Sequence, residues 1–132
     1  MYSPFVEPDV VRLELKRGLW IDVRRELTFG EQQAMFARMR IQMGPGEAPV
    51  LDTTRIGRAR MEAYIVGWSF VNPQGKPVPI TPAALDNLKT RDAREIRDAL
   101  ELHEMTVQAA QEEEKNDPDG APVSSPTSPS VS

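Results

Sequence analysis

One segment governs how the chain can fold: Trp68-Ser69-Phe70-Val71-Asn72-Pro73-Gln74-Gly75-Lys76-Pro77-Val78-Pro79-Ile80-Thr81. It lies between a helical pattern that ends near Phe70 and another that starts at Thr81. Its three prolines, together with Asn72 and Gly75, disfavour a helix and predict a stiff joint. The apolar residues that flank the joint can pack against a core. The segment contains no catalytic grouping, so it predicts architecture rather than chemistry.

Length and composition point to a single small domain. The chain has 132 residues, of which 39% are hydrophobic, and it contains no cysteine. The absence of cysteine excludes disulfides, zinc–thiolate sites and thiol catalysis. No apolar run approaches the roughly 18 residues that span a bilayer, and Met1–Phe5 has neither the basic start nor the apolar region of a secretion signal. We therefore expect an intracellular protein that does not associate with membranes.

The N-terminal part predicts a β-hairpin over residues 10–25, after an extension over residues 1–9. Apolar and polar residues alternate on both sides of Arg17-Gly18, which is the pattern of two strands joined by a short turn. A lone hairpin is only marginally stable in water. Its apolar face must therefore cover helices or meet another strand.

A first helix is predicted over about residues 29–43. Thr28 and Glu31 form a capping-box pattern at its start, and Gly44-Pro45-Gly46 ends it. One face of this helix carries a methionine-rich set: Met35, Phe36, Met39 and Met43. Such a face is typical of a helix packed on its own core, and methionine also adapts to varied partners.

A second helix is predicted over about residues 54–70, after the N-cap candidates Asp52, Thr53 and Thr54. Its apolar side carries Ile56, Ala59, Ala63, Val66 and Phe70. Gly57 and Gly67 each lower helix propensity by about 1 kcal/mol relative to alanine. The alternative is that these glycines allow a neighbouring element to approach closely.

Two further helices are predicted after the joint, over about residues 82–89 and 91–112. Thr81-Pro82 is a strong helix start, and the last helix carries an apolar stripe with charge pairs such as Arg91/Glu95 on its surface. Residues 116–132 are rich in proline and serine and predict a disordered tail. The predicted fold is mainly α (α+β): a hairpin and about four helices in one domain over residues 10–110.

The sequence predicts no catalytic, cofactor or metal site, and we expect no enzyme. His103 is the only histidine, and one histidine in a helical stripe does not build a catalytic group. Arg55, Arg58 and Arg60, near Tyr64 and Trp68, leave open a small nucleic-acid-binding regulator. Residues 1–70 have a net charge of only +1 and residues 71–132 of −5, which makes nucleic acid an improbable partner.

The order of these parts resembles the tail assembly chaperones of long-tailed bacteriophages. In that family a Trp-containing strand precedes helices, and a proline-rich connector leads into a short helix and a final amphipathic helix. The matching residues here are Trp20, Leu27-Thr28, Trp68, Asn72, Gly75-Lys76-Pro77, Pro79-Ile80-Thr81, Ala84-Leu85 and Leu88. The resemblance covers roughly residues 10–108.

The resemblance implies a non-enzymatic protein without cofactors. Its partner would be the long, helical tape measure protein, which it would keep soluble in the host cytoplasm until tail tube subunits polymerise. We expect partner contacts at Met35, Phe36, Met39 and Trp68, an absence from the mature virion, and possible contact with the tail tube protein; self-association stays open.

Two further expectations accompany the resemblance. The family often makes a longer product by ribosomal frameshifting, and Glu114-Lys115-Asn116 can be encoded by a slippery heptamer. A longer form would then diverge at Lys115–Asn116, which the gene sequence decides. The alternative function is a structural virion component, such as a head–tail connector or tail completion protein, which would be found in purified virions.

Overall fold

The computed structural model describes residues 2–41, 44–48 and 50–115. Met43 and the predicted disordered tail, 116–132, lie outside the described residues. Contacts divide the chain into two compact units, Met1–Glu101 and Leu102–Ser132. The described residues form four α-helices and a three-stranded antiparallel sheet, which is a small α+β fold.

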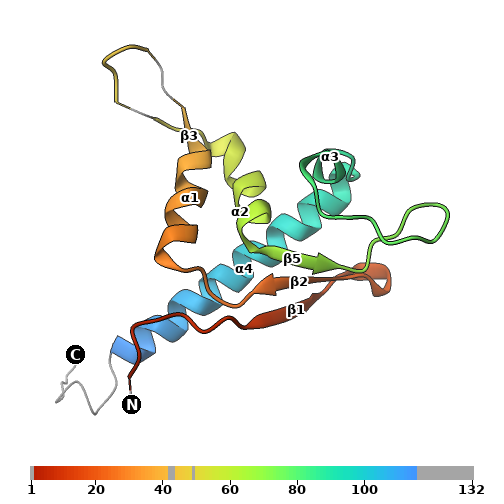
Figure 1. The fold of residues 1–132 in the computed structure, drawn as a ribbon, viewed down its shortest axis with the longest axis horizontal. Helices are drawn as coiled ribbons and strands as arrows, with labels where there is room; N and C mark the ends of the chain where they lie inside the picture. The colour runs from red at the N-terminus through yellow and green to blue at the C-terminus, as the bar shows by residue number, and fades with distance from the viewer. Residues whose placement is uncertain (1, 42–43, 49, 116–132) are drawn as a thin grey trace, which may run out of the picture. The chain divides into compact units, whose positions relative to one another are not determined.

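The sheet is built from the predicted hairpin and one further strand. Strands β1 (Val10–Glu14) and β2 (Trp20–Arg24) are antiparallel, and β5 (Ile65–Trp68) pairs with the other edge of β2 (Figure 1). The hairpin prediction is confirmed. The third strand supplies the partner that a lone hairpin lacks.

Strand β5 contradicts the predicted helix over residues 54–70. Helix α2 spans only Ile56–Tyr64, after a 3-10 turn at Thr53–Arg55, and the chain then becomes extended. Ile21 of β2 lies opposite Trp68 in this pairing. Residues 65–68 gain burial and backbone hydrogen bonds in the sheet, and this favours the strand over the helix that the spacing of Val66 and Phe70 predicted.

Helix α1 (Phe29–Met39) begins as predicted and ends early. The Glu31 amide donates to Thr28 Oγ1 at 3.1 Å, and the Thr28 amide donates to the Glu31 carboxylate at 2.9 Å, which completes the capping box. The predicted end at residue 43 is wrong because Arg40 is already extended. Strand β3 (Arg40–Ile41) pairs there with β4 (Val50–Leu51).

The last two helices also differ from their predicted bounds. Helix α3 covers Pro82–Asp86, with Thr81 as its N-cap and Pro82 at its first turn, so the predicted start is confirmed and the predicted end at 89 is wrong. Helix α4 covers Thr90–Lys115, slightly longer than predicted. The loop between them is short, and the two helices follow one another closely.

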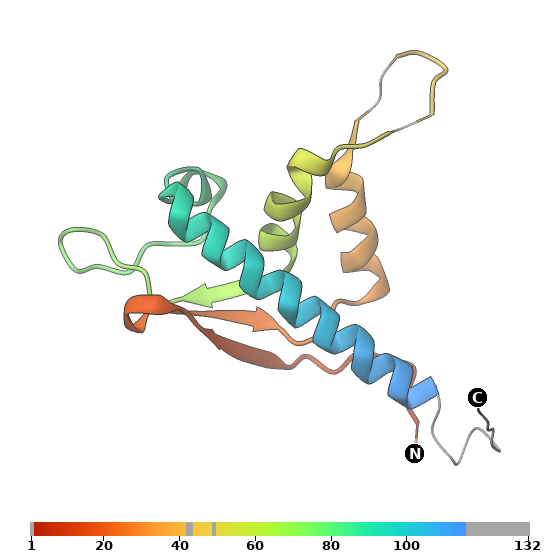
Figure 2. The same cartoon turned by 180° about the vertical axis from the view of Figure 1, so that it is seen from behind.

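The first unit has one hydrophobic core to which the sheet and all four helices contribute. Helices α1 and α2 lie side by side, and α4, up to Glu101, crosses one face of the sheet (Figures 1 and 2). The most deeply buried members are Ile21, Val23, Met35, Ile96 and Leu100, each no more than 1% exposed. The side chains that alternate with Ile21 and Val23 along β2 are only half-buried.

One of those side chains, Asp22, is held by a cross-strand arginine. Arg12 donates two hydrogen bonds to the Asp22 carboxylate, at 2.8 and 3.1 Å, and its guanidinium lies 3.5 Å from the centre of the Trp20 ring. The hydrogen bond from Arg12 lowers the pKa of Asp22 below its ordinary value. The contacts fix the register of β1 on β2 at the middle of the hairpin.

Gly57 of α2 leaves room for the side chain of Arg97 on α4. A Cβ at Gly57 would overlap the Arg97 Cδ and lie 2.9 Å from the Arg97 Cγ. We expect Gly57→Ala to destabilise the protein, although it gains about 1 kcal/mol of helix propensity.

A double-mutant cycle separates these two effects. In an Arg97→Ala background the same Gly57→Ala substitution should stabilise by about 0.5–1 kcal/mol, because only the propensity gain remains. Urea unfolding of the four proteins measures the difference. Equal effects of Gly57→Ala in both backgrounds would show that Arg97 does not limit this position.

Candidate functional site

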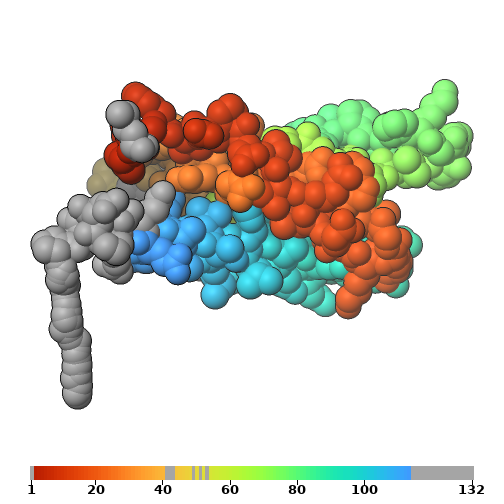
Figure 3. Space-filling view, turned by 90° about the horizontal axis from the view of Figure 1, so that it is seen from below, coloured from red at the N-terminus to blue at the C-terminus, as the bar shows by residue number. Residues whose placement is uncertain are grey.

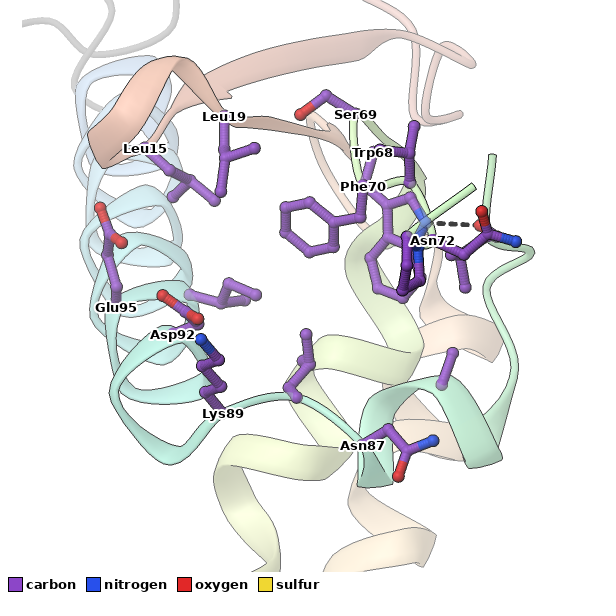
Figure 4. Close-up of a pocket in the computed structure, with 16 residues that line it drawn as sticks. Leu15, Leu19, Trp68, Ser69, Phe70, Asn72, Asn87, Lys89, Asp92 and Glu95 are labelled. Atoms are coloured by element: carbon purple, nitrogen blue, oxygen red, sulfur yellow. Dashed lines mark hydrogen bonds between the residues drawn. The ribbon is translucent and has the colours of Figure 1, made fainter. Parts of the chain in front are cut away.

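A pocket of about 500 Å³ lies where the hairpin turn, the joint and the start of α4 meet. Leu15 and Leu19 line it from the turn, Trp68 and Phe70 from β5 and the joint, and Asp92, Glu95 and Ile96 from α4 (Figure 4). Leu88 and Ala84 line it from the α3 region. Its volume lies within the range typical of ligand sites, and most of its lining is apolar.

Trp68 and Phe70 form an aromatic wall on one side of the pocket. Their ring centres are 4.8 Å apart with the planes 27° from parallel, and the Trp68 indole Nε1–H donates to the Val78 carbonyl at 2.7 Å. The Val78 amide in turn donates to the Phe70 carbonyl at 3.1 Å. Together these contacts fold the joint back on itself and hold the rings in place.

Asn72 closes the turn of the joint. Its Oδ1 accepts from the amides of Gln74 and Lys76 at 2.9 and 3.0 Å, and its own amide donates to the Lys76 carbonyl at 2.8 Å. Gly75 has a φ of 78°, in the left-handed region that glycine adopts without strain. The joint is therefore non-helical, as predicted, and is a hydrogen-bonded loop rather than a simple spacer.

Two carboxylates of α4 hold the hairpin turn opposite the aromatic wall. Glu95 accepts from the Lys16 amide at 2.6 Å, and Arg17 Nη1 donates to Asp92 at 3.2 Å. The space-filling view shows the orange turn against the cyan start of α4 (Figure 3). Arg17 has a φ of 62°, which is uncommon for a residue with a side chain, and its contact with Asp92 helps to hold it there.

The four predicted contact residues do not form one surface. Met35 and Met39 are 1% and 3% exposed and belong to the core, so the structure does not support their predicted role in partner contact. Phe36 is exposed on α1, and Trp68 lies at the pocket. Met35 and Met39 therefore lie on the face that α1 packs against the protein's own core, as expected for an ordinary amphipathic helix.

Phe29 is an exposed residue that sequence reasoning missed. It is 74% exposed on α1, and Phe36, two turns further on, is 40% exposed. Their spacing of seven residues places both rings on one side of the helix. The seven-residue spacing of Phe29 and Phe36 is a sequence signal from which this shared side could have been predicted.

Two of the three arginines considered for nucleic acid, Arg55 and Arg58, are held by acidic groups of the same chain. Arg58 contacts Glu62 and Asp86, and Arg55 lies 3.2 Å from Asp52. The hydrogen bond that Arg58 donates to Asp86 is the main cause that raises the pKa of Arg58. Arg58 links α2 to α3, and Arg55 contacts the segment just before α2. Because acidic side chains already engage both guanidinium groups, the arrangement does not favour phosphate binding.

No family model, curated protein or solved structure matches the chain. Among the described residues, no cluster of three or more His, Cys, Asp or Glu side chains could hold a metal ion. In the same part of the chain, no helix has the length and apolar character to span a membrane.

Proposed function

We propose that this protein is a tail assembly chaperone of the kind found in long-tailed bacteriophages, acting on the tape measure protein in the host cytoplasm. The observation that carries the proposal is the pocket, because four of the residues behind the family resemblance line it: Trp68, Asn72, Ala84 and Leu88. Trp68 forms a wall, Asn72 and Gly75 shape the loop, and Thr81 caps α3 by accepting from the Ala84 amide at 3.1 Å. The motif therefore supplies part of the pocket lining and the loop beside it.

The pocket suits one large apolar side chain of a helical partner. Burying such a side chain contributes about 1.5–3 kcal/mol, which is far too little for a tight complex on its own. Several copies bound along one long helical partner would cover it together while each contact stays reversible. A chaperone that growing tube subunits must displace needs this kind of binding.

A chaperone of this kind should be encoded just upstream of a very long helical protein, and co-expression of the two tests the proposal. We expect a larger soluble fraction of that protein and a recoverable complex. Val71→Asp should reduce both, because Val71 is 56% exposed at the pocket and a charge there opposes apolar contact. The matched control is Val66→Asp, at a residue that is 41% exposed and does not line the pocket.

Two results would contradict the proposal. One is a partner that stays equally insoluble with no complex recovered, while circular dichroism shows the protein folded. The other is detection of the protein as a stoichiometric component of purified virions, which would favour the structural alternative.

A further inference from the structure

The two walls of the pocket differ in chemical character. Trp68 and Phe70 face the carboxylate-bearing side of α4 across the cavity, and Leu15 and Leu19 lie at one end between them (Figure 4). An occupant therefore meets aromatic and aliphatic carbon on most sides and carboxylate oxygens on one. This combination is found where proteins bind a cation that is attached to an apolar body.

Glu95 is the group that makes the α4 wall acidic. Arg17 Nη1 lies 3.2 Å from the Asp92 carboxylate, whereas the Glu95 carboxylate accepts a 2.6 Å hydrogen bond from the Lys16 amide. Among the described residues, no lysine or arginine side chain forms an ion pair with Glu95, and the contact from Lys16 comes from its backbone amide. A backbone amide carries no net charge, so this hydrogen bond leaves the Glu95 carboxylate without a balancing cation.

Lys89 also lines the pocket, at the opposite end of the same wall. Asp92 lies between Lys89 and Glu95 along α4 (Figure 4). An anion placed at Lys89 would lie close to the Asp92 carboxylate, which opposes it. A cation near Glu95 meets no such opposition from Asp92, because both carboxylates attract it.

We propose that the pocket binds a cationic group on an apolar body, with the apolar part between Trp68 and the leucines and the charge at Glu95. In a protein partner this is an amphipathic helix with a lysine or arginine one turn from a large apolar residue. The identity of that partner rests on the proposed function, whereas the chemistry of the pocket belongs to this chain alone.

Three small compounds with one phenyl body test this chemistry on the full chain: 2-phenylethylamine, 2-phenylethanol and phenylacetate. Binding is followed by NMR through the indole N–H signal of Trp68, with that of Trp20 as the internal reference. We expect the amine to bind about five-fold more tightly than the alcohol at low salt, and phenylacetate to bind most weakly. The preference for the amine should shrink in high salt.

Glu95→Gln is the decisive variant. The glutamine carbonyl can still accept the Lys16 hydrogen bond, so the turn stays held while the charge is removed. We expect the amine and the alcohol then to bind equally. Asp98→Asn is the control, since Asp98 is exposed on the same helix and does not line the pocket; it should leave the amine preference unchanged.

Several outcomes would overturn the inference. These are no shift of the Trp68 signal with any compound at millimolar concentration, equal binding of all three, tightest binding of phenylacetate, or an amine preference that survives Glu95→Gln. The ligand-binding measurements do not depend on the outcome of the co-expression experiment. A selective pocket with no rescue of the helical partner rejects the proposed function alone, and rescue without selectivity rejects this inference alone.

Discussion

Replacing Leu100 by alanine should lower the free energy of unfolding by about 3–4 kcal/mol, because the side chain is fully buried and a cavity remains. Leu100 is 0% exposed in the core that the sheet shares with the helices. A domain of this size has a total stability of about 5–10 kcal/mol, so the variant loses a large fraction of it. Urea unfolding followed by circular dichroism measures the change.

Leu102 provides the matched control for this experiment. It is the same residue type on the same helix, two positions away, and it is 65% exposed. Leu102→Ala should change stability by less than about 0.5 kcal/mol. Equal losses for the two variants would mean that α4 is not oriented on the sheet as described.

This pair also shows why α4 could be predicted well. The stripe that contains Ile96 and Leu100 repeats every three to four residues, and both residues are fully buried. The starts of α1 and α3 were predictable for a similar reason. A capping box and a Thr-Pro pair act within one turn of the chain, so nothing distant decides them.

Strand β5 could not be predicted in the same way. The run Ile65–Trp68 follows a true helix without a break, and a short apolar run fits either a helix end or a buried strand. Its partner, β2, lies more than forty residues earlier in the sequence. The β-branched pair Ile65-Val66 followed by Gly67 was the local sign of a strand.

The candidate site was predicted only in part. Trp68 was selected from the joint and does line the pocket. The acidic wall was missed because Glu95 matched a surface pair with Arg91, four residues before it. In the structure Glu95 instead binds the Lys16 amide, which is 79 positions away and becomes a neighbour only through the fold.

Replacing Trp68 by alanine should destabilise the protein by about 3 kcal/mol. The substitution removes the stacked contact with Phe70 and the hydrogen bond to the Val78 carbonyl. The returning part of the joint, residues 76–79, then keeps the hydrogen bond from the Val78 amide to the Phe70 carbonyl and the two hydrogen bonds between Asn72 and Lys76. Urea unfolding gives the stability, and hydrogen exchange at Val78 reports on the joint itself.

Trp68→Phe distinguishes the contribution of the aromatic ring from that of the indole N–H group. Phenylalanine keeps most of the aromatic contact and loses only the indole donor, so we expect a loss of about 1 kcal/mol, near the net value of one hydrogen bond. Exchange at the Val78 amide should rise more in the alanine variant than in the phenylalanine variant. If both variants cost the same, the hydrogen bond alone holds the joint, and the aromatic wall contributes little to the fold. A small cost in both would mean that the joint folds independently of the sheet, and the pocket between them would then have no fixed shape.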